Sequence, residues 1–322
     1  MKDLWKYTKT LITIVILIFF IYYFINNKGD FLFVLSTPIK YLIVIAILYS
    51  VIFFLNGIFI KVILKSFKKK MSVFEAFYLS VISSLGNYFL PMRGGLVYKS
   101  VYLKKKFKFP FSHFISFLYG NYIIVFLVNS FLALLALFVI QSKLGVISIP
   151  LYVFFGLLFV SMIVLSVVKF PVERIKESRY KFINRVVNII KNILNGWNII
   201  EDDKRLLFSL ILITFAGFTF STLLFYVEFK ALGIDTNFVS VILYTCLSGV
   251  SLLVSLTPGS LGIREGIFVI TSDILGITNE QVMQLALLDR GVMLISLFFL
   301  SGLFLIFKVL LNRDEKFSQR EV

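Results

Sequence analysis

The sequence predicts an all-α polytopic membrane protein with about six transmembrane helices and two re-entrant hairpins, arranged as an inverted repeat. Its 322 residues are 59% hydrophobic and 16% charged, whereas an average soluble domain is about 25% charged. Apolar runs long enough to cross a bilayer recur along the chain. Two further apolar segments have flanks of the same charge character at both ends, so each is expected to enter and leave the membrane on one side.

The six predicted spans are uncharged runs close to the roughly 17–25 residues that a membrane helix needs. They are Leu11–Ile25, Tyr41–Ile60, Phe114–Ile140, Pro150–Val168, Leu206–Val227 and Val292–Phe307. The first run is short and follows a lysine-rich start, and no small-residue cleavage site comes after it. We therefore expect an uncleaved signal anchor at this position.

Basic residues predict how the chain is oriented. Of the 33 lysines and arginines, 27 lie in five segments: residues 1–10, 61–70, 93–108, 169–205 and 308–320. Cytoplasmic loops of membrane proteins carry such an excess of positive charge. We therefore expect these segments and both chain termini in the cytoplasm, with the protein in the plasma membrane.

The same charges predict the two hairpins. Residues 71–106 have cytoplasmic flanks and residues 238–275 have external flanks, so the hairpins are expected to enter the membrane from opposite sides. The chain, 1–322, is then a single transmembrane domain with two halves, 10–140 and 206–310, and the last helix of the second half is expected over residues 284–310. The alternative, in which each hairpin is a pair of full spans, leaves the repeat unchanged.

Residues 150–205 are predicted to join the halves through one span and a cytoplasmic amphipathic segment. Hydrophobic residues recur there at three- and four-residue spacing, with basic residues between them: Ile175, Phe182, Val186, Ile190, Ile193 and Trp197. A helix of this kind can lie on an anionic membrane surface. It is equally well explained as a linker that packs against the rest of the protein.

The first hairpin contains an interrupted apolar stretch, SSLGNYFLPMRGG. Paired helix interruptions in two halves of a membrane protein indicate a central substrate site. The predicted hinge residues here are Pro91, Gly94 and Gly95. The predicted substrate-binding residues are Asn87, Arg93, Tyr98 and Lys99. A guanidinium group and a helix N-terminus both favour a phosphate; the alternative explanation for Arg93 and Lys99 is that they are cytoplasmic charges that set the topology.

The second hairpin repeats the pattern with VSLTPGSLGIREG. Its predicted hinge residues are Pro258, Gly259, Gly262 and Gly266. Its predicted substrate-binding residues, together with one from the last helix, are Thr257, Ser260, Arg264, Glu265 and Arg290. The positive-inside rule does not explain Arg264, and an unpaired arginine at the membrane centre costs about 3 kcal/mol. Its structural partner could be Glu265, Asp289 or Glu228, and its functional partner a lipid phosphate. Arg290, next to Asp289, is expected in a structural ion pair, although it could line the same cavity.

Other kinds of site find little support. The chain has one histidine, His113, and one cysteine, Cys246, so we expect no zinc or haem site and no cofactor. The acidic run Glu201, Asp202, Asp203 either binds a metal, as in sugar-nucleotide transferases, or caps the following helix. Nucleic acid is not expected as a partner, because anionic lipid headgroups explain the basic, aromatic runs of a membrane protein better.

The two interruptions resemble motifs of a known family. NYFLPMRGGLVYKSVYLKKK looks like the N-x-x-L-P-x-R-x-G motif of the lysylphosphatidylglycerol synthase transmembrane-region family, and SLTPGSLGIREGIFVI resembles its P-G-x-x-G-x-R-E-G motif. The resemblance covers roughly residues 10–310. The family includes the membrane half of the multiple peptide resistance factor, implicated in flipping aminoacylated phospholipid, and members associated with glycolipid or polyprenol-linked sugar pathways. The synthases continue into a soluble aminoacyltransferase domain, whereas this sequence ends at Val322, so the resemblance does not imply synthase activity here.

The combined prediction is a flippase-like lipid translocator or lipid-binding protein. Its ligand would be an anionic phospholipid, an aminoacyl-phospholipid or a polyprenyl-phosphate lipid, with Arg93 and Arg264 alternating as phosphate contacts. No nucleotide-binding motif is present, so transport would be downhill or coupled to an ion gradient. Two alternatives stay open: a membrane transferase that makes an aminoacyl-lipid or a lipid-linked sugar, and a scaffold whose partners are lipid-synthesis enzymes.

Overall fold

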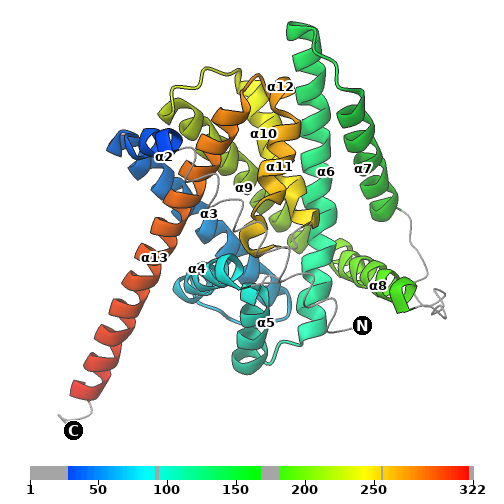
Figure 1. Cartoon of the computed structure of the whole chain (residues 1–322). Coiled ribbons are helices and arrows are strands. Elements are labelled where there is room, and N and C mark those ends of the chain that lie inside the picture. Colours follow the sequence, from blue (N-terminus) through cyan, green and yellow to red (C-terminus); the bar gives the residue numbers. More distant parts are fainter. Residues whose placement is uncertain (1–27, 91–93, 168–180, 255–256, 319–322) are drawn as a thin grey trace.

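The computed structural model describes residues 28–90, 94–167, 181–254 and 257–318. Every regular element within these ranges is a helix (Figure 1). The predicted signal anchor lies outside the described residues, as do Pro91 and Arg93 of the first motif. In chain order the elements are α2 (Lys28–Leu35), α3 (Ile39–Ser66), α4 (Val73–Phe89), α5 (Gly94–Phe107), α6 (Phe111–Leu144), α7 (Ile149–Val167), α8 (Lys181–Asp202), α9 (Lys204–Ala231), α10 (Phe238–Val250), η2 (Ser251–Val254), η3 (Pro258–Ser260), α11 (Ile263–Ile270), α12 (Ser272–Leu275) and α13 (Asn279–Ser318).

Five helices of the described chain are long and apolar enough to cross a membrane. These segments are Ile39–Ser66, Phe111–Lys143, Ile149–Val167, Lys204–Ala231 and Asn279–Ile306. Each overlaps one of the spans predicted from hydropathy. The protein is therefore an all-α polytopic membrane protein, as predicted.

The last of these helices, α13, begins earlier than the predicted range 284–310, at Asn279. A reciprocal cap explains the early start. Thr278 Oγ1 accepts a hydrogen bond from the backbone N–H of Gln281 at 3.2 Å, and Gln281 Oε1 accepts one from the N–H of Thr278 at 2.9 Å. This capping box satisfies two N–H groups that a helix start leaves free. Asp289 and Arg290, both buried, lie on this helix.

Broken helical segments occupy both regions predicted as hairpins. Residues 71–106 contain α4 and nearly all of α5, while residues 238–275 contain α10, η2, η3, α11 and α12. In Figure 1, α5 lies at the end of the molecule where α6 begins, and α12 lies at the end where α6 finishes. Between them η3 contacts α4. The second interruption therefore lies against α4, the first helix of the other broken segment. The membrane sides of the segments and the inverted repeat stay predictions.

Helices α4 and α5 pack against each other with little space between their backbones. A Cβ atom built on Gly86 would lie 2.9 Å from the Cα of Gly95, and one built on Gly95 would lie 1.7 Å from the backbone oxygen of Ser83. The predicted hinge residue Gly95 therefore lies in a helix–helix contact.

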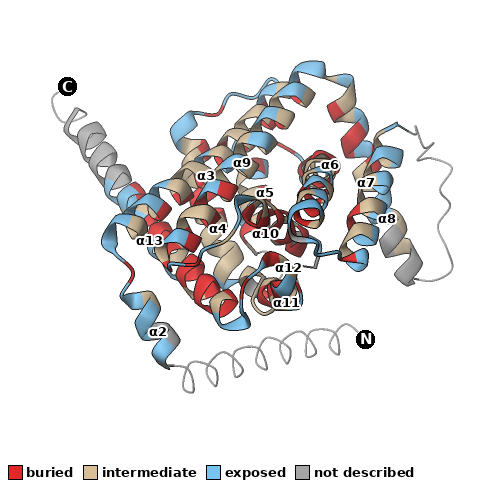
Figure 2. Ribbon diagram, turned by 90° about the horizontal axis from the view of Figure 1, so that it is seen from above, coloured by how far each residue is buried: buried red, intermediate tan, exposed pale blue. Residues whose placement is uncertain are grey.

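Burial is concentrated at the centre of the bundle. Figure 2 shows α10 surrounded by other helices, with most exposed residues on the outer surfaces. In α10, eight of its 13 residues are buried: Ser240, Val241, Leu243, Tyr244, Thr245, Cys246, Leu247 and Val250. Helix α7 is the opposite case, since its only buried residue is Phe155. An apolar outer surface of this kind suits contact with lipid.

Helix α8 covers part of the predicted amphipathic segment. Its C-terminal part packs against α6 so closely that a Cβ atom on Gly196 would lie 1.7 Å from the backbone oxygen of Ser116. Trp197 is buried and donates a hydrogen bond from Nε1 to the backbone oxygen of Ser166 at 3.1 Å. This part of the segment therefore fits the packed-linker explanation. Among the other predicted hydrophobic positions, Ile190 is exposed and Ile193 is partly buried; Ile175 and the side chains of Phe182 and Val186 lie outside what the structure describes.

The acidic run before α9 has a local structural role. Asp203 is the N-cap residue of α9, and its Oδ1 accepts hydrogen bonds from the backbone N–H groups of Arg205 and Leu206, both at 3.1 Å. Of the two explanations for this run, the helix cap is the one that the structure contains for Asp203.

Candidate functional site

A cluster of charged side chains lies where α9, α11 and α13 approach one another beside η3. We call Glu228, Arg264, Glu265, Asp289 and Arg290 the buried charge cluster. All but Arg264 are buried as whole residues. Charged groups in the interior of a membrane protein are costly and usually mark a functional pathway. This cluster is therefore the candidate site.

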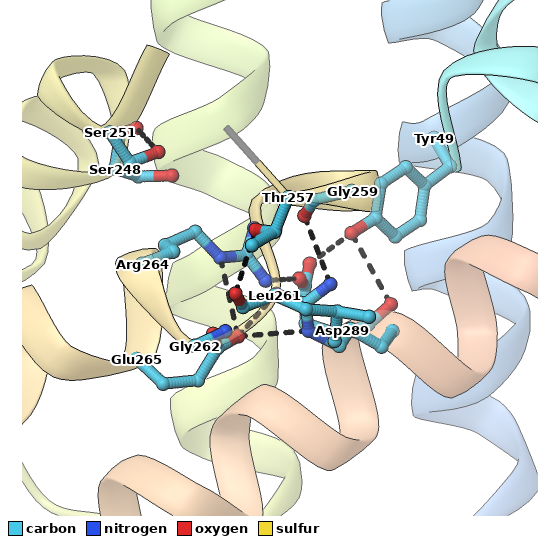
Figure 3. Close-up of polar contacts among 11 residues, drawn as sticks. Tyr49, Ser248, Ser251, Thr257, Gly259, Leu261, Gly262, Arg264, Glu265 and Asp289 are labelled. Carbon is cyan, nitrogen blue, oxygen red and sulfur yellow. Dashed lines mark hydrogen bonds and ion pairs between the residues drawn. The ribbon is translucent and has the colours of Figure 1, made fainter. Parts of the chain in front are cut away.

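Two crossed ion pairs join α11 to α13, and Figure 3 shows Arg264, Glu265 and Asp289 close together. Arg264 Nη2 on α11 bonds to Asp289 Oδ2 on α13. In the opposite sense, Arg290 on α13 bonds through Nε to Glu265 Oε1 on α11 at 2.8 Å. Successive residues of a helix point in different directions, so neighbours in sequence reach different partners. Arg290 is thus in an ion pair, as predicted, and its partner is Glu265.

The loop before α11 is organised around the same groups. Glu265 Oε2 accepts the backbone N–H of Gly262, the N-cap residue of α11, at 2.8 Å. Arg290 Nη1 donates to the backbone oxygen of Gly259 at 3.1 Å. Gly259 has φ 56°, a left-handed conformation that strongly favours glycine. Thr257, which is buried, donates from Oγ1 to the backbone oxygen of Leu261 at 2.8 Å and closes the turn.

Tyr88 connects this loop to the first broken segment. The residue lies near the end of α4, and its ring atoms come within 3.1 Å of where a Cβ on Gly259 would be. The guanidinium carbon of Arg290 lies 6.0 Å from the centre of the same ring, a distance at which a cation and an aromatic face attract. The end of α4 therefore contacts the second interruption through Tyr88, Gly259 and Arg290.

Asp289 holds two donors from different helices. Tyr49 of α3 donates from its hydroxyl group to Asp289 Oδ1, and Arg264 bonds to Oδ2. The side chain of Asp289 is 2% exposed, whereas that of Arg264 is 16% exposed. The Nε atom of Arg264 is buried and makes no hydrogen bond among the described residues, and Glu265 Oε1 lies 4.0 Å from it. Of the two arginines in the cluster, Arg264 has the more exposed side chain, since that of Arg290 is 9% exposed.

Glu228 is the one member of the cluster that takes part in neither pair. It is completely buried on α9, and neither carboxyl oxygen accepts a hydrogen bond of normal geometry from the described residues. Asp289 and Arg264 are the charges that act on it. The charges of this cluster also act on Tyr244 of α10. The ring of Tyr244 is stacked on that of Phe268, with 3.8 Å between the ring centres.

The other predicted residues of the second motif lie in η3 and α11. Ser260, like Gly259, has a positive φ, 53°. Gly266 has open space where a Cβ would be. Pro258 begins η3. The roles of these residues as hinge or ligand contacts stay predictions.

In the first motif, the described residues serve the helix junction. Asn87 Oδ1 accepts the backbone N–H of Leu96 at 3.1 Å, so the amide caps the restart of the helix at α5. Gly94 is the first residue of α5, Tyr98 is 40% exposed and Lys99 is partly buried. Burial lowers the pKa of the Lys99 ammonium group from 10.5 to about 8.

Sequence reasoning did not single out Tyr49, Tyr88 or Tyr244 and treated Glu228 and Asp289 only as possible partners of Arg264. The carboxylates carried a usable signal, because each interrupts an otherwise apolar helix. The tyrosines carried none, since tyrosine is common in membrane helices. Tyr49 is separated from Asp289 by 240 residues, so only the folded chain brings them together.

Comparison with known proteins identifies a family for this chain. A family model described as "Lysylphosphatidylglycerol synthase TM region" matches residues 9–301. No curated protein and no solved structure matches the chain.

Proposed function

Because the chain belongs to the lysylphosphatidylglycerol synthase transmembrane-region family, we propose that it binds an anionic lipid headgroup and moves it between the two membrane leaflets. The observation that carries this proposal is Arg264, an arginine with a partly exposed side chain that Asp289 holds inside a membrane protein. The site is thus a cationic group with a counter-ion that a lipid phosphate can replace.

The chemistry of Arg264 suits a phosphate. A guanidinium group donates two parallel hydrogen bonds to a phosphate and keeps its charge at any physiological pH. Its Nε atom is buried 4.0 Å from Glu265 Oε1, so a ligand would bind at the Nη atoms. A headgroup oxygen would take the place of the Asp289 carboxylate on Nη2. Arg93 would provide the second phosphate contact as the headgroup moves, with the two broken segments entering from opposite membrane sides.

The loop geometry supports movement of this site. Arg264 lies two residues after the left-handed N-cap Gly262, and Arg290 ties the preceding turn to α13. Displacement of Asp289 from Arg264 would therefore release α11 from one of its two ionic links to α13. Such a change of partner gives the protein two arrangements that the ligand can select between.

The transferase alternative relied on the acidic run at residues 201–203. Asp203 is occupied as the cap of α9, so no observation on the described chain favours that alternative. A product assay with purified protein and radiolabelled lipid precursors would detect such an activity directly.

The test of transport uses proteoliposomes containing a fluorescent phosphatidylglycerol in both leaflets and a membrane-impermeant quencher outside. We expect the wild-type protein to expose the inner-leaflet probe and a charge-balanced Arg264→Gln/Asp289→Asn variant to slow exposure about 10- to 100-fold. That range corresponds to the roughly 1.5–3 kcal/mol of hydrogen bonds to a charged group. Lys143→Gln, at the exposed end of α6, is the matched control. Equal exchange rates in all three proteins would exclude Arg264 from the mechanism.

A further inference from the structure

The buried charge cluster contains more acidic than basic groups. Its two guanidinium groups, Arg264 and Arg290, face three carboxyl groups, Glu228, Glu265 and Asp289. If every group were ionised, the cluster would carry one excess negative charge. An uncompensated charge in a low-dielectric interior costs several kcal/mol, so the cluster needs one additional positive charge or a bound proton.

Hydrogen bonding identifies which carboxyl group is not compensated. Asp289 accepts a hydrogen bond from Tyr49 on Oδ1 and one from Arg264 on Oδ2. Glu265 accepts a hydrogen bond from Arg290 on Oε1 and one from the backbone N–H of Gly262 on Oε2. Both are therefore solvated as carboxylates by the protein.

Glu228 has no such donors. Its residue exposure is 0%, and neither of its oxygens accepts a hydrogen bond of normal geometry from the described residues; the side chain that interacts with it as a hydrogen-bonding partner is the carboxyl group of Asp289. A carboxylate in that position would have lost its hydration without replacement, whereas a neutral carboxyl group loses far less. The geometry thus places the compensating proton on Glu228.

The groups around Glu228 come from four other elements. Asp289 on α13 and Arg264 on α11 are the charges that act on it directly. The charge of Glu228 also acts on Tyr49 on α3 and on Tyr244 on α10. A metal cation would have to enter beside the positive charge of Arg264, while a proton adds no volume and neutralises the carboxyl group covalently. A proton therefore fits the site better than sodium.

We propose that Glu228 is a proton-binding site, and that a headgroup phosphate bound at Arg264 brings a second proton onto the carboxyl pair formed by Glu228 and Asp289. The second part of this proposal rests on the proposed function. In the empty site the pair holds one proton, on Glu228, and Asp289 is the counter-ion of Arg264. When a phosphate oxygen displaces Asp289, the two carboxyl groups lose that cation, and a proton taken from solution neutralises Asp289.

The charges balance at both stages. The empty cluster with one proton is neutral, and the cluster with a singly charged headgroup and two protons is neutral as well. Release of the headgroup returns Asp289 to Arg264 and expels the second proton. Anionic lipid binding is then linked to proton uptake, and lower pH favours it.

The first experiment tests the proton on Glu228 without any lipid. Infrared spectra of the purified protein in a nonionic detergent should contain the carbonyl band of a protonated carboxyl group that shifts in D2O. We expect the band to be absent from Glu228→Gln and retained in Asp235→Asn, which changes an exposed carboxylate. A wild-type spectrum without the band, or a band that sodium chloride removes at constant pH, would overturn the assignment.

The second experiment measures proton uptake while phosphatidylglycerol is titrated into weakly buffered wild-type protein with a pH indicator. Charge balance predicts about one proton taken up per lipid bound. The Glu228→Gln/Asp289→Asn variant should bind the lipid with no proton uptake and with an affinity that does not change with pH. Phosphatidylcholine is the control lipid.

The outcomes separate the two proposals. Binding of phosphatidylglycerol to wild-type protein without proton uptake would overturn the coupling and leave the proposed function standing. Failure of phosphatidylglycerol to bind at all would contradict the proposed function and with it the coupling, while the infrared band would still decide whether Glu228 holds a proton. If the double variant does not fold, the wild-type titration alone decides the coupling.

Discussion

The ion pair between Glu265 and Arg290 gives the sharpest stability prediction. The Glu265 side chain is 5% exposed and accepts Arg290 Nε at 2.8 Å and the backbone N–H of Gly262 at 2.8 Å. Glu265→Gln keeps the size of the side chain and removes its charge. Arg290, 9% exposed, is then a buried cation without its counter-ion.

The expected magnitude follows from these contacts. Removing one partner of a buried ion pair typically costs about 3–5 kcal/mol. Loss of the contact to the helix start adds about 1 kcal/mol, the typical value of a cap. Each kcal/mol lowers the melting temperature of a domain of 150–250 residues by about 2–4 °C. We therefore expect Glu265→Gln to lower the melting temperature of the detergent-purified protein by roughly 10 °C or more.

The matched control is Glu280→Gln, in the exposed first turn of α13, where loss of a helix-dipole contact costs about 0.3–1 kcal/mol. Thermal unfolding followed by intrinsic fluorescence measures both variants. In Glu265→Gln/Arg290→Gln the unpaired cation is gone, so the double variant should be more stable than the sum of the two single losses predicts. A melting temperature for Glu265→Gln equal to that of the control, or strict additivity in the double variant, would refute the reasoning.

Two further predictions concern packing and protonation. Gly196→Ala should reduce the free energy of unfolding by about 1–3 kcal/mol or more, because the added Cβ would lie 1.7 Å from a backbone oxygen of α6. Gly156→Ala is the control and should be neutral or slightly stabilising, because the space around Gly156 is open. Equal melting temperatures for the two variants would contradict the close α6–α8 contact. Lys99→Met should raise the melting temperature at pH 7, because the folded protein disfavours the charged ammonium group, whose pKa falls from 10.5 to about 8. The free-energy penalty of the buried ammonium group is fully present below pH 8 and disappears as the pH rises towards 10.5, so the gain in melting temperature should shrink over that window. The control, Lys105→Met at an exposed position, should show no such pH dependence. A gain for Lys99→Met that does not change with pH would show that packing causes it.

The sequence was sufficient to identify the membrane helices and the broken segments. Hydropathy located the spans in α3, α6, α7, α9 and α13, because an apolar run of sufficient length has few alternatives to a membrane helix. Proline and glycine clusters located the interruptions, because proline lacks the N–H that continues a helix and glycine readily adopts left-handed backbone. The start of α13 was predicted five residues too late, since the prediction followed hydropathy and overlooked the capping pair Thr278 and Gln281.

The sequence also showed that Arg264 must have a partner, because its cost in a membrane is a property of the residue itself. It did not show which partner, and only the tertiary structure decided that Arg264 pairs with Asp289, that Arg290 pairs with Glu265 and that Glu228 has neither. The hydropathy of an apolar stretch is a sum over neighbouring residues, so it can be determined from the sequence alone. The choice of ionic partner depends on the rotation and spacing of three packed helices, and no local pattern in the sequence records these.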